Sequence, residues 1–353
     1  NVVLKREPVM NPIFSRTLKA LCAVAAAALL SACGGASSTF EPFRPTRVIA
    51  FGDGFSYVDA DGYGLSTVRT GEVDNTVAGR IAARVGIVVK SVAANSLSAN
   101  PSATNPLAAT GGFSYATAQA RVADVDSQIT AFLNTSGGVV AKQDLIIITV
   151  GNWDVYDAVM SGTSVDTATT NLVTSIGRLV SAGAEHVVVM PAINMARTPW
   201  ALGALATPSL TNNKSLADIQ KLSITTSSLP SLTSFNFLLL QKLNNAYRQD
   251  KKPVYLLDRS VDFNNFAGKF DTDGVTRILN ISGMTITADT GLYDPVCNTT
   301  VRGNFAGCAI ADLTNSTDYP TYVFADNINL TPLANRYLAD RIVALLLGYG
   351  WLP

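Results

Sequence analysis

The chain has 353 residues, of which 48% are hydrophobic and 15% charged, with 26 basic and 26 acidic side chains. This length allows one large domain or two small ones, and the apolar fraction is too high for a disordered chain. Because the charges balance and no basic stripe with interleaved aromatic residues is present, nucleic acid is excluded as an expected partner.

The N-terminal region has the pattern of an export signal. Arg16 and Lys19 precede an apolar run at residues 20–30. A membrane-spanning helix needs about 20 apolar residues, so this run is too short to serve as one. We therefore expect residues 1–32 to be a lipoprotein signal peptide, with Met10 as the true start.

The apolar run ends in Leu-Ser-Ala-Cys, which resembles the bacterial lipobox, where the cysteine is acylated and becomes the mature N-terminus. The resemblance implies that Cys33 anchors the protein in the membrane through several acyl chains. An ordinary signal peptide with a chance cysteine is the alternative. Gly34 after the cysteine resembles lipoproteins of the outer membrane of a Gram-negative envelope, on its periplasmic or cell-surface side. A tether over residues 33–46 and a single domain over residues 47–353 should follow.

Within this domain, short apolar runs alternate with helical patterns, which favours a parallel sheet with helices on both faces. The expected strands are residues 48–51, 88–92, 145–150, 186–190 and 254–257. The expected helices are residues 75–85, 117–133, 167–182, 234–248 and 332–347. The last helix is the clearest, because Thr331 can cap it, Pro332 suits its first turn and Gly348 stops it. Residues 201–232 and 259–322 are rich in Ser, Thr, Asn and Gly and predict long surface loops.

Two cysteines remain in the domain, Cys297 and Cys308, close together in a polar stretch. We expect a disulfide between them, because exported chains meet an oxidising compartment and closing so short a loop contributes roughly 2–3 kcal/mol. A zinc site is the alternative, but no histidine or further cysteine stands nearby to complete four ligands. No metal or other cofactor is expected.

The first expected strand runs into a tight turn with the sequence Gly-Asp-Gly-Phe at residues 52–55. This phrase resembles the first block of the SGNH (GDSL) ester hydrolases, in which a strand ends in Gly-Asp-Ser-Leu and the serine attacks the ester. Further blocks match at residues 115–121, 151–154 and 326–329. The resemblance implies a three-layer α/β/α fold of flavodoxin-like type, with a central, mostly parallel five-stranded sheet.

The four residues that carry the chemistry of this family are all replaced. Where the family has its serine nucleophile, this chain has Gly54. The two family residues that stabilise the oxyanion correspond to Gln119 and Trp153, and the histidine base corresponds to Asn329. The single histidine of the chain, His186, begins a strand and is expected about 15 Å or more from the site. The sequence therefore predicts a family member without ester hydrolase activity.

Several residues near the replaced positions keep chemically useful groups. The carboxyl groups of Asp53, Asp154 and Asp326 remain, but no imidazole is present for them to orient, and their spacing is not diagnostic of a metal site. Ser56 is the fallback nucleophile, two residues beyond the family position. Asn152 is an alternative oxyanion donor if the third block shifts by one residue.

Three functions are compatible with these residues. The first is non-catalytic binding of a glycan, an acyl or ester ligand, or a protein, through the candidate contacts Phe55, Tyr57, Gln119, Asn152 and Trp153. In this hypothesis Trp153 is either a platform for the ligand or a plug that fills the old cleft. The second is an active esterase or lipase with the relocated nucleophile Ser56. The third is a self-assembling surface component or homo-oligomer, because low charge favours association.

Overall fold

The computed structural model describes residues 43–65, 76–92, 110–203, 207–247, 253–260, 262–263, 277–281, 284–288, 295–297, 310–313 and 322–353. The predicted signal peptide, Cys33 and Cys308 lie outside these ranges. The compact unit that contains the described residues begins at Phe43. Among the residues in these ranges, no helix combines the length and apolar character that a bilayer crossing requires.

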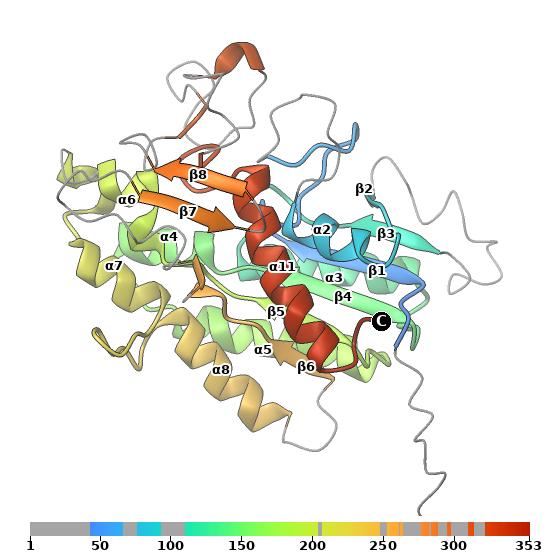
Figure 1. Cartoon of the computed structure of the whole chain (residues 1–353). Coiled ribbons are helices and arrows are strands. Elements are labelled where there is room, and N and C mark those ends of the chain that lie inside the picture. The colour runs from blue at the N-terminus through green and yellow to red at the C-terminus, as the bar shows by residue number, and fades with distance from the viewer. Residues whose placement is uncertain are drawn as a thin grey trace, which may run out of the picture. The chain divides into compact units, whose positions relative to one another are not determined.

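A six-stranded, all-parallel sheet forms the centre of the domain (Figure 1), in the order β2-β3-β1-β4-β5-β6. Its strands are β1 Arg47–Gly52, β2 Val89–Ser91, β3 Gly111–Ser114, β4 Asp144–Thr149, β5 Val187–Met190 and β6 Val254–Leu256. Every residue of β1 and β4 is buried, as the continuous apolar runs of these strands predict for a sheet covered on both faces.

Helices cover both faces of the sheet. On one face α2 Val77–Ala83 packs against α11 Pro332–Gly348, which crosses in front of the sheet in Figure 1. On the other face α5 Asp166–Ser181 lies between α3 Val122–Thr135 and α8 Phe235–Ala246. The predicted cap of α11 is confirmed, because Thr331 Oγ1 accepts a hydrogen bond from Ala334 N at 3.4 Å. This arrangement is the α/β fold of SGNH hydrolases.

The sheet differs from the expected one by one strand. The strand that the sequence did not predict is β3. Its sequence, Gly-Gly-Phe-Ser, has neither the length nor the β-branched residues of a recognisable strand. Its glycine content has a packing reason, since a Cβ at Gly112 would lie 2.6 Å from the carbonyl oxygen of Val88 beside the neighbouring strand β2. The close approach of the two backbones requires glycine there.

Other elements fall in regions predicted as loops. The stretch 201–232 includes the end of α6 Pro199–Gly203, the 3-10 helix η4 Pro208–Thr211 and the helix α7 Leu216–Ser223. The stretch 259–322 includes an antiparallel hairpin of β7 Arg277–Ile281 and β8 Met284–Ala288, and the short turn η6 Ile310–Asp312. The remaining elements are α4 Asn152–Ser161 and η3 Met195–Arg197. Serine and threonine caps make such helices look like loops when only composition is considered.

At the amino ends of the central strands, a buried ion pair joins β1 to β4. Arg47 Nη2 lies 2.6 Å from Asp144 Oδ2 and Arg47 Nε lies 2.7 Å from Asp144 Oδ1, with both side chains only 1% exposed. The pair is bidentate, the strongest geometry for these groups. It fixes the register of β1 and β4, and therefore the relative height of the loops at their carboxyl ends.

Candidate functional site

The candidate site lies where β1 and β4 end. The strand order reverses here, since the chain continues from β1 outward to β2 and β3 on one side and to β4 on the other. In open α/β sheets, ligands bind at such switch points. Gly52 has a φ of +116°, and a Cβ on it would overlap the carbonyl oxygen of Thr149. Only glycine permits this close approach, which brings the loop after β1 onto the end of β4.

Asp53 is buried in this loop and its carboxylate is satisfied on both oxygens. Oδ1 accepts from Phe55 N at 3.2 Å and lies 3.0 Å from the hydroxyl of Thr149. Oδ2 accepts from Asn152 Nδ2 at 2.9 Å. Burial raises the pKa of Asp53 to about 6, and these hydrogen bonds limit the rise. Asp53 therefore ties the β1 loop to the β4 loop.

The side chain of Asn329 fills the space where a side chain on Gly54 would lie. A Cβ added to Gly54 would overlap Asn329 Oδ1 and would lie 3.1 Å from Asn329 Cγ and 3.3 Å from the carbonyl oxygen of Ala118. The amide of Asn329 is oriented by Asp326, because its Nδ2 donates to Asp326 Oδ2 at 2.7 Å. Its Oδ1 therefore points at Gly54. The side chain of Asn329 therefore fills the space beside Gly54.

Asp326 organises the loop that carries Asn329. Its Oδ1 accepts from the backbone N–H groups of Ile328 at 2.9 Å and Asn329 at 2.7 Å. Its side chain has no exposed surface, and burial raises its pKa to about 6 against the effect of these hydrogen bonds. Both carboxyl oxygens of Asp326 are therefore used in hydrogen bonds within its own loop. An amide such as Asn329 has no basic lone pair with which to accept a proton from a nucleophile.

The segment around Cys297 supports this loop. Val296 N donates to Phe324 O at 3.0 Å and Cys297 N donates to Ala325 O at 2.9 Å. Cys297 is disulfide-bonded, as the sequence predicts. The cysteine segment is thus hydrogen-bonded to the residues immediately before Asp326.

The fallback nucleophile Ser56 lies inside the loop after β1. Its side chain has no exposed surface, and its Oγ lies 2.9 Å from Thr149 Oγ1. Its carbonyl oxygen accepts from Ser114 Oγ at 2.7 Å. Ser56 and Asp53 both contact Thr149, so a hydroxyl, a second hydroxyl and a carboxyl group form a buried chain.

Trp153 is buried, with 2% of its surface exposed, and corresponds to the plug rather than to a ligand platform. Because α4 begins at Asn152, Trp153 lies in the first turn of a helix and packs against Tyr156 at 5.4 Å between ring centroids. The guanidinium of Arg121 covers the Trp153 ring at 5.4 Å, the distance of a cation–π contact.

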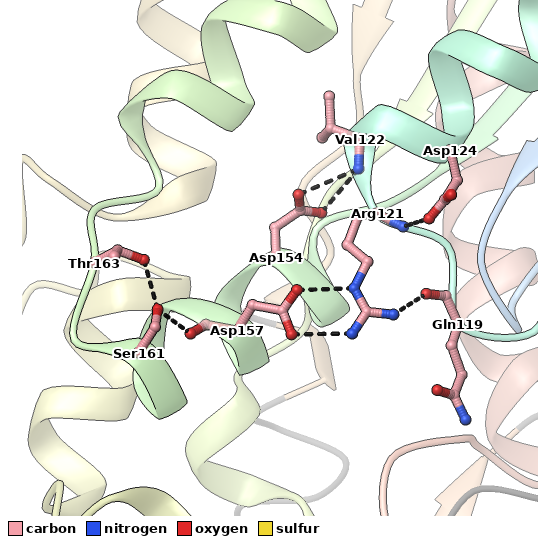
Figure 2. A network of polar contacts seen from close by, with 8 residues as sticks. All are labelled: Gln119, Arg121, Val122, Asp124, Asp154, Asp157, Ser161 and Thr163. Atoms are coloured by element: carbon pink, nitrogen blue, oxygen red, sulfur yellow. Dashed lines mark hydrogen bonds and ion pairs between the residues drawn. The ribbon is translucent and has the colours of Figure 1, made fainter.

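Figure 2 shows the polar network around Arg121. Arg121 forms a bidentate ion pair with Asp157, with Nε–Oδ2 and Nη2–Oδ1 distances of 2.8 and 2.9 Å, and donates to the carbonyl oxygen of Gln119 at 2.7 Å. Both oxygens of Asp154 accept from Val122 N at 3.2 Å. The network joins the start of α3 to α4 at the edge of the candidate site.

Asp154 is the most strongly perturbed carboxyl group of this network. Burial raises its pKa to about 7, and the nearby charges of Asp157 and Asp53 add to the rise while the Val122 N–H opposes it. Arg121 is directed at Asp157 instead of Asp154. A carboxyl group of this kind exchanges protons near neutral pH.

The hypothetical ligand contacts are not on one surface. Phe55 and Asn152 are buried like Trp153, and Asn152 is engaged at both ends of its amide, by Asp53 and by Ile193 N at 3.0 Å from its Oδ1. Tyr57 is half-buried and Gln119 is exposed. Phe55, Asn152 and Trp153 are thus less accessible to a ligand in this structure than Tyr57 and Gln119.

Two residues that position the site were not identified from the sequence. Thr149 connects Asp53 to Ser56, as described above. Gln128 of α3 accepts from Gly52 N at 2.7 Å and donates to Gly52 O at 3.1 Å, which completes the backbone hydrogen bonding at the end of β1. A polar side chain within the buried face of an amphipathic helix is the signal that identifies Gln128. Among the described residues, no three His, Cys, Asp or Glu side chains gather as a metal ion would require.

The six-stranded, all-parallel sheet flanked by helices is an α/β fold of the SGNH-hydrolase type. The chain belongs to the GDSL-like lipase/acylhydrolase family, which it matches over residues 48–342. A search of curated protein sequences finds no match.

Solved structures resemble the chain at low sequence identity. Protein YxiM from Bacillus subtilis is 12% identical, with a TM-score of 0.42 over 88% of this chain and 58% of that one, so this chain spans little more than half of that relative. A member of the lipolytic G-D-S-L family from Veillonella parvula is 11% identical, with a TM-score of 0.38 over 85% and 98% of the two chains. A possible lipase from Chitinophaga pinensis is 10% identical, with a TM-score of 0.38 over 86% and 99%.

Proposed function

We propose that this GDSL-family chain does not hydrolyse esters at the family site and acts instead as a lipid-anchored binding protein of the cell envelope. The observation that carries the proposal is the overlap between Asn329 Oδ1 and the space where a side chain on Gly54 would lie. A serine hydroxyl is missing from one position and a proton acceptor from the other. A fold alone does not carry its usual activity, so the site decides.

Two independent features support the non-hydrolytic reading. Trp153 packs into the interior beside Arg121, at a family position that supplies an oxyanion donor. The alternative donor Asn152 has its amide engaged with Asp53 and with the backbone of Ile193. The site therefore offers few hydrogen-bond donors to a developing oxyanion, and it also lacks a nucleophile.

The envelope location rests on the export signal and on Cys33 in the lipobox pattern. The disulfide at Cys297 supports it, because disulfides persist in oxidising compartments such as the periplasm and the cell surface. Acylation of Cys33 by more than one chain would give stable membrane attachment.

The hydrolytic part of the proposal is tested with p-nitrophenyl butyrate and the purified mature chain. We expect no turnover above that of a heat-denatured sample. The variant Ser56→Ala is the matched control, because it removes the fallback hydroxyl, and Ser114→Ala removes a neighbouring hydroxyl that the fallback mechanism does not use. Turnover by the wild type would contradict the proposal.

A relocated esterase site is the second candidate function. The chain from Ser56 through Thr149 to Asp53 favours it, because a carboxyl group whose pKa is raised to about 6 could accept the serine proton through the threonine hydroxyl. The buried position of Ser56 opposes it. This candidate requires turnover that Ser56→Ala abolishes and Ser114→Ala preserves.

Binding is tested at the two hypothetical contacts that are not fully buried. We expect Gln119→Ala and Tyr57→Ala to weaken the binding of p-nitrophenyl butyrate, used as an acyl probe and followed by isothermal titration. Trp153→Phe, which keeps a buried aromatic ring, should leave it unchanged. If both surface variants bind the probe as the wild type does, the hypothesis that this site binds an acyl ligand is wrong.

A further inference from the structure

A continuous row of aromatic rings lies at the amino ends of the strands, opposite the candidate site. Phe43 stacks on His186 with ring centroids 3.5 Å apart and planes 9° from parallel, and its backbone N–H donates to Gly350 O at 3.3 Å. His186 then meets the edge of Trp351 at 4.8 Å. Figure 1 shows the C-terminus beside the amino ends of β1 and β4.

The row continues to the molecular surface. Tyr255 meets Trp351 at 4.6 Å and stacks on Tyr349 at 4.4 Å. Tyr349 is 43% exposed, whereas Trp351 is 8% exposed. Trp351 is therefore a buried ring in the middle of the row, and Tyr349 is its solvent-facing end. A half-exposed tyrosine on an apolar support is an arrangement found at membrane interfaces.

Exposed apolar side chains concentrate at the same end of the sheet. Among the described residues, eight large hydrophobic side chains are exposed, and four of them lie here: Val88 at 57%, Val139 at 44%, Leu347 at 41% and Tyr349 at 43%. Val88 precedes β2, Val139 lies in the loop that leads to β4, and the other two end α11. We call these four residues, together with Phe43, the amino-end face.

The loops that carry this face are joined by backbone hydrogen bonds. Val140 N, next to Val139, donates to Ala182 O at 2.8 Å in the turn before β5. Thr46 N donates to Gln143 O at 3.2 Å, between the segments that enter β1 and β4. The amino-end face is thus carried on hydrogen-bonded loops of one compact unit.

The compact unit begins on this face, at Phe43. Phe43 follows Cys33 by ten residues in the sequence. A fully extended chain of that length spans at most about 35 Å. An acylated Cys33 would hold Phe43 within that distance of the bilayer, while the candidate site lies a further strand length away at the carboxyl ends of β1 and β4.

We propose that the amino-end face lies against a phospholipid bilayer, so that the Gly54–Asn329 site points away from the membrane. This proposal rests on the lipid anchor of the proposed function and specifies which surface the anchor brings to the lipid. Aliphatic side chains and an exposed tyrosine beside the anchor add a second attachment to the acyl chains, and attachments of two kinds make membrane binding stable. A ligand would then approach the site from the aqueous side.

The experiment uses the full acylated chain on vesicles of phosphatidylethanolamine and phosphatidylglycerol. An environment-sensitive fluorophore is attached to Val139→Cys on the amino-end face, or to Leu232→Cys, a matched control that is 69% exposed before α8. We expect the label at position 139 to shift to the blue and to be quenched by spin-labelled lipid. The label at position 232 should do neither.

Flotation of the vesicles separates the possible failures. If the protein floats but the two labels are quenched equally, the orientation is wrong and the anchor stands. If the protein does not float, the anchor fails and the orientation with it. If the label at position 139 shifts without vesicles and in proportion to protein concentration, a second copy of the chain covers the face, and the bilayer is the wrong occupant.

Discussion

The fit between Gly54 and Asn329 predicts a strong energetic coupling between two positions far apart in the sequence. In Gly54→Ala, the new methyl group overlaps Asn329 Oδ1, so Asn329 must either move away from Asp326 or be compressed. Overpacking a buried site costs about 1–3 kcal/mol, and giving up a buried hydrogen bond to a carboxylate costs a similar amount. The φ of Gly54 is not in the left-handed region, so alanine gains about 0.4–1 kcal/mol by restricting the unfolded chain.

The expected result for Gly54→Ala is a net loss of about 1–2 kcal/mol in the free energy of unfolding. In the background of Asn329→Ala the overlap disappears, and the carbonyl oxygen of Ala118 remains at 3.3 Å, a tight but tolerable contact. Gly54→Ala should then cost less than about 0.5 kcal/mol or should stabilise the protein. The two substitutions are therefore expected to be strongly non-additive.

The assay is urea unfolding of the wild type, the two single variants and the double variant, followed by tryptophan fluorescence and circular dichroism. Gly86→Ala is not a suitable control because its φ is +74°, whereas Gly348→Ala changes a helical glycine with no atom within 4 Å of the added methyl group. Additive free energies for Gly54→Ala and Asn329→Ala would refute the reasoning, since they would mean that the two side-chain positions do not compete for one space.

Three further predictions follow from groups that are buried or cross-linked. The pKa of Asp154 is raised from 3.8 to about 7 in the folded protein, so protonation favours folding, and this contribution to stability is lost as the pH rises from about 4 to 7. In urea unfolding, Asp154→Asn should flatten this decline of stability with pH. An unchanged pH profile would contradict the assignment. Asp144→Ala should cost about 3–5 kcal/mol in chemical unfolding by leaving the buried Arg47 without its partner, and a loss below about 1 kcal/mol would contradict it. Reduction of the disulfide at Cys297 should speed amide hydrogen exchange at Asn329 as measured by NMR, and equal exchange rates in both redox states would disprove the coupling.

The buried strands were predictable because their apolar runs are continuous. Residues 48–51 and 145–148 have no polar interruption, as a parallel sheet covered on both faces requires. The strand β3 was not predictable from the same rule. Its glycine is required by the close approach of a neighbouring backbone, and that approach cannot be read from the sequence. Likewise, α7 begins with a capping box between Ser215 and Asp218, in a stretch whose serine and threonine content indicates loop.

At the candidate site, the family pattern indicated which residues to compare but not how their side chains fit together. That Gly54 lacks a hydroxyl is a property of one residue. That Asn329 fills its place depends on the packing of the loop before α11 onto the loop after β1, which no local pattern encodes. Choosing between the plug and platform alternatives for Trp153 also required the packing, because the start of α4 at Asn152 is what turns the ring inward.

The stacking of His186 on Phe43 makes the molecule its own spectroscopic reporter. His186 is the one histidine of the chain, so the imidazole region of a proton NMR spectrum contains a single set of ring signals from the protein. Those signals experience the ring currents of Phe43 on one side and Trp351 on the other. Detachment of Phe43 would change their chemical shift without any label. One unmodified side chain thus records whether the beginning of the domain is held in place.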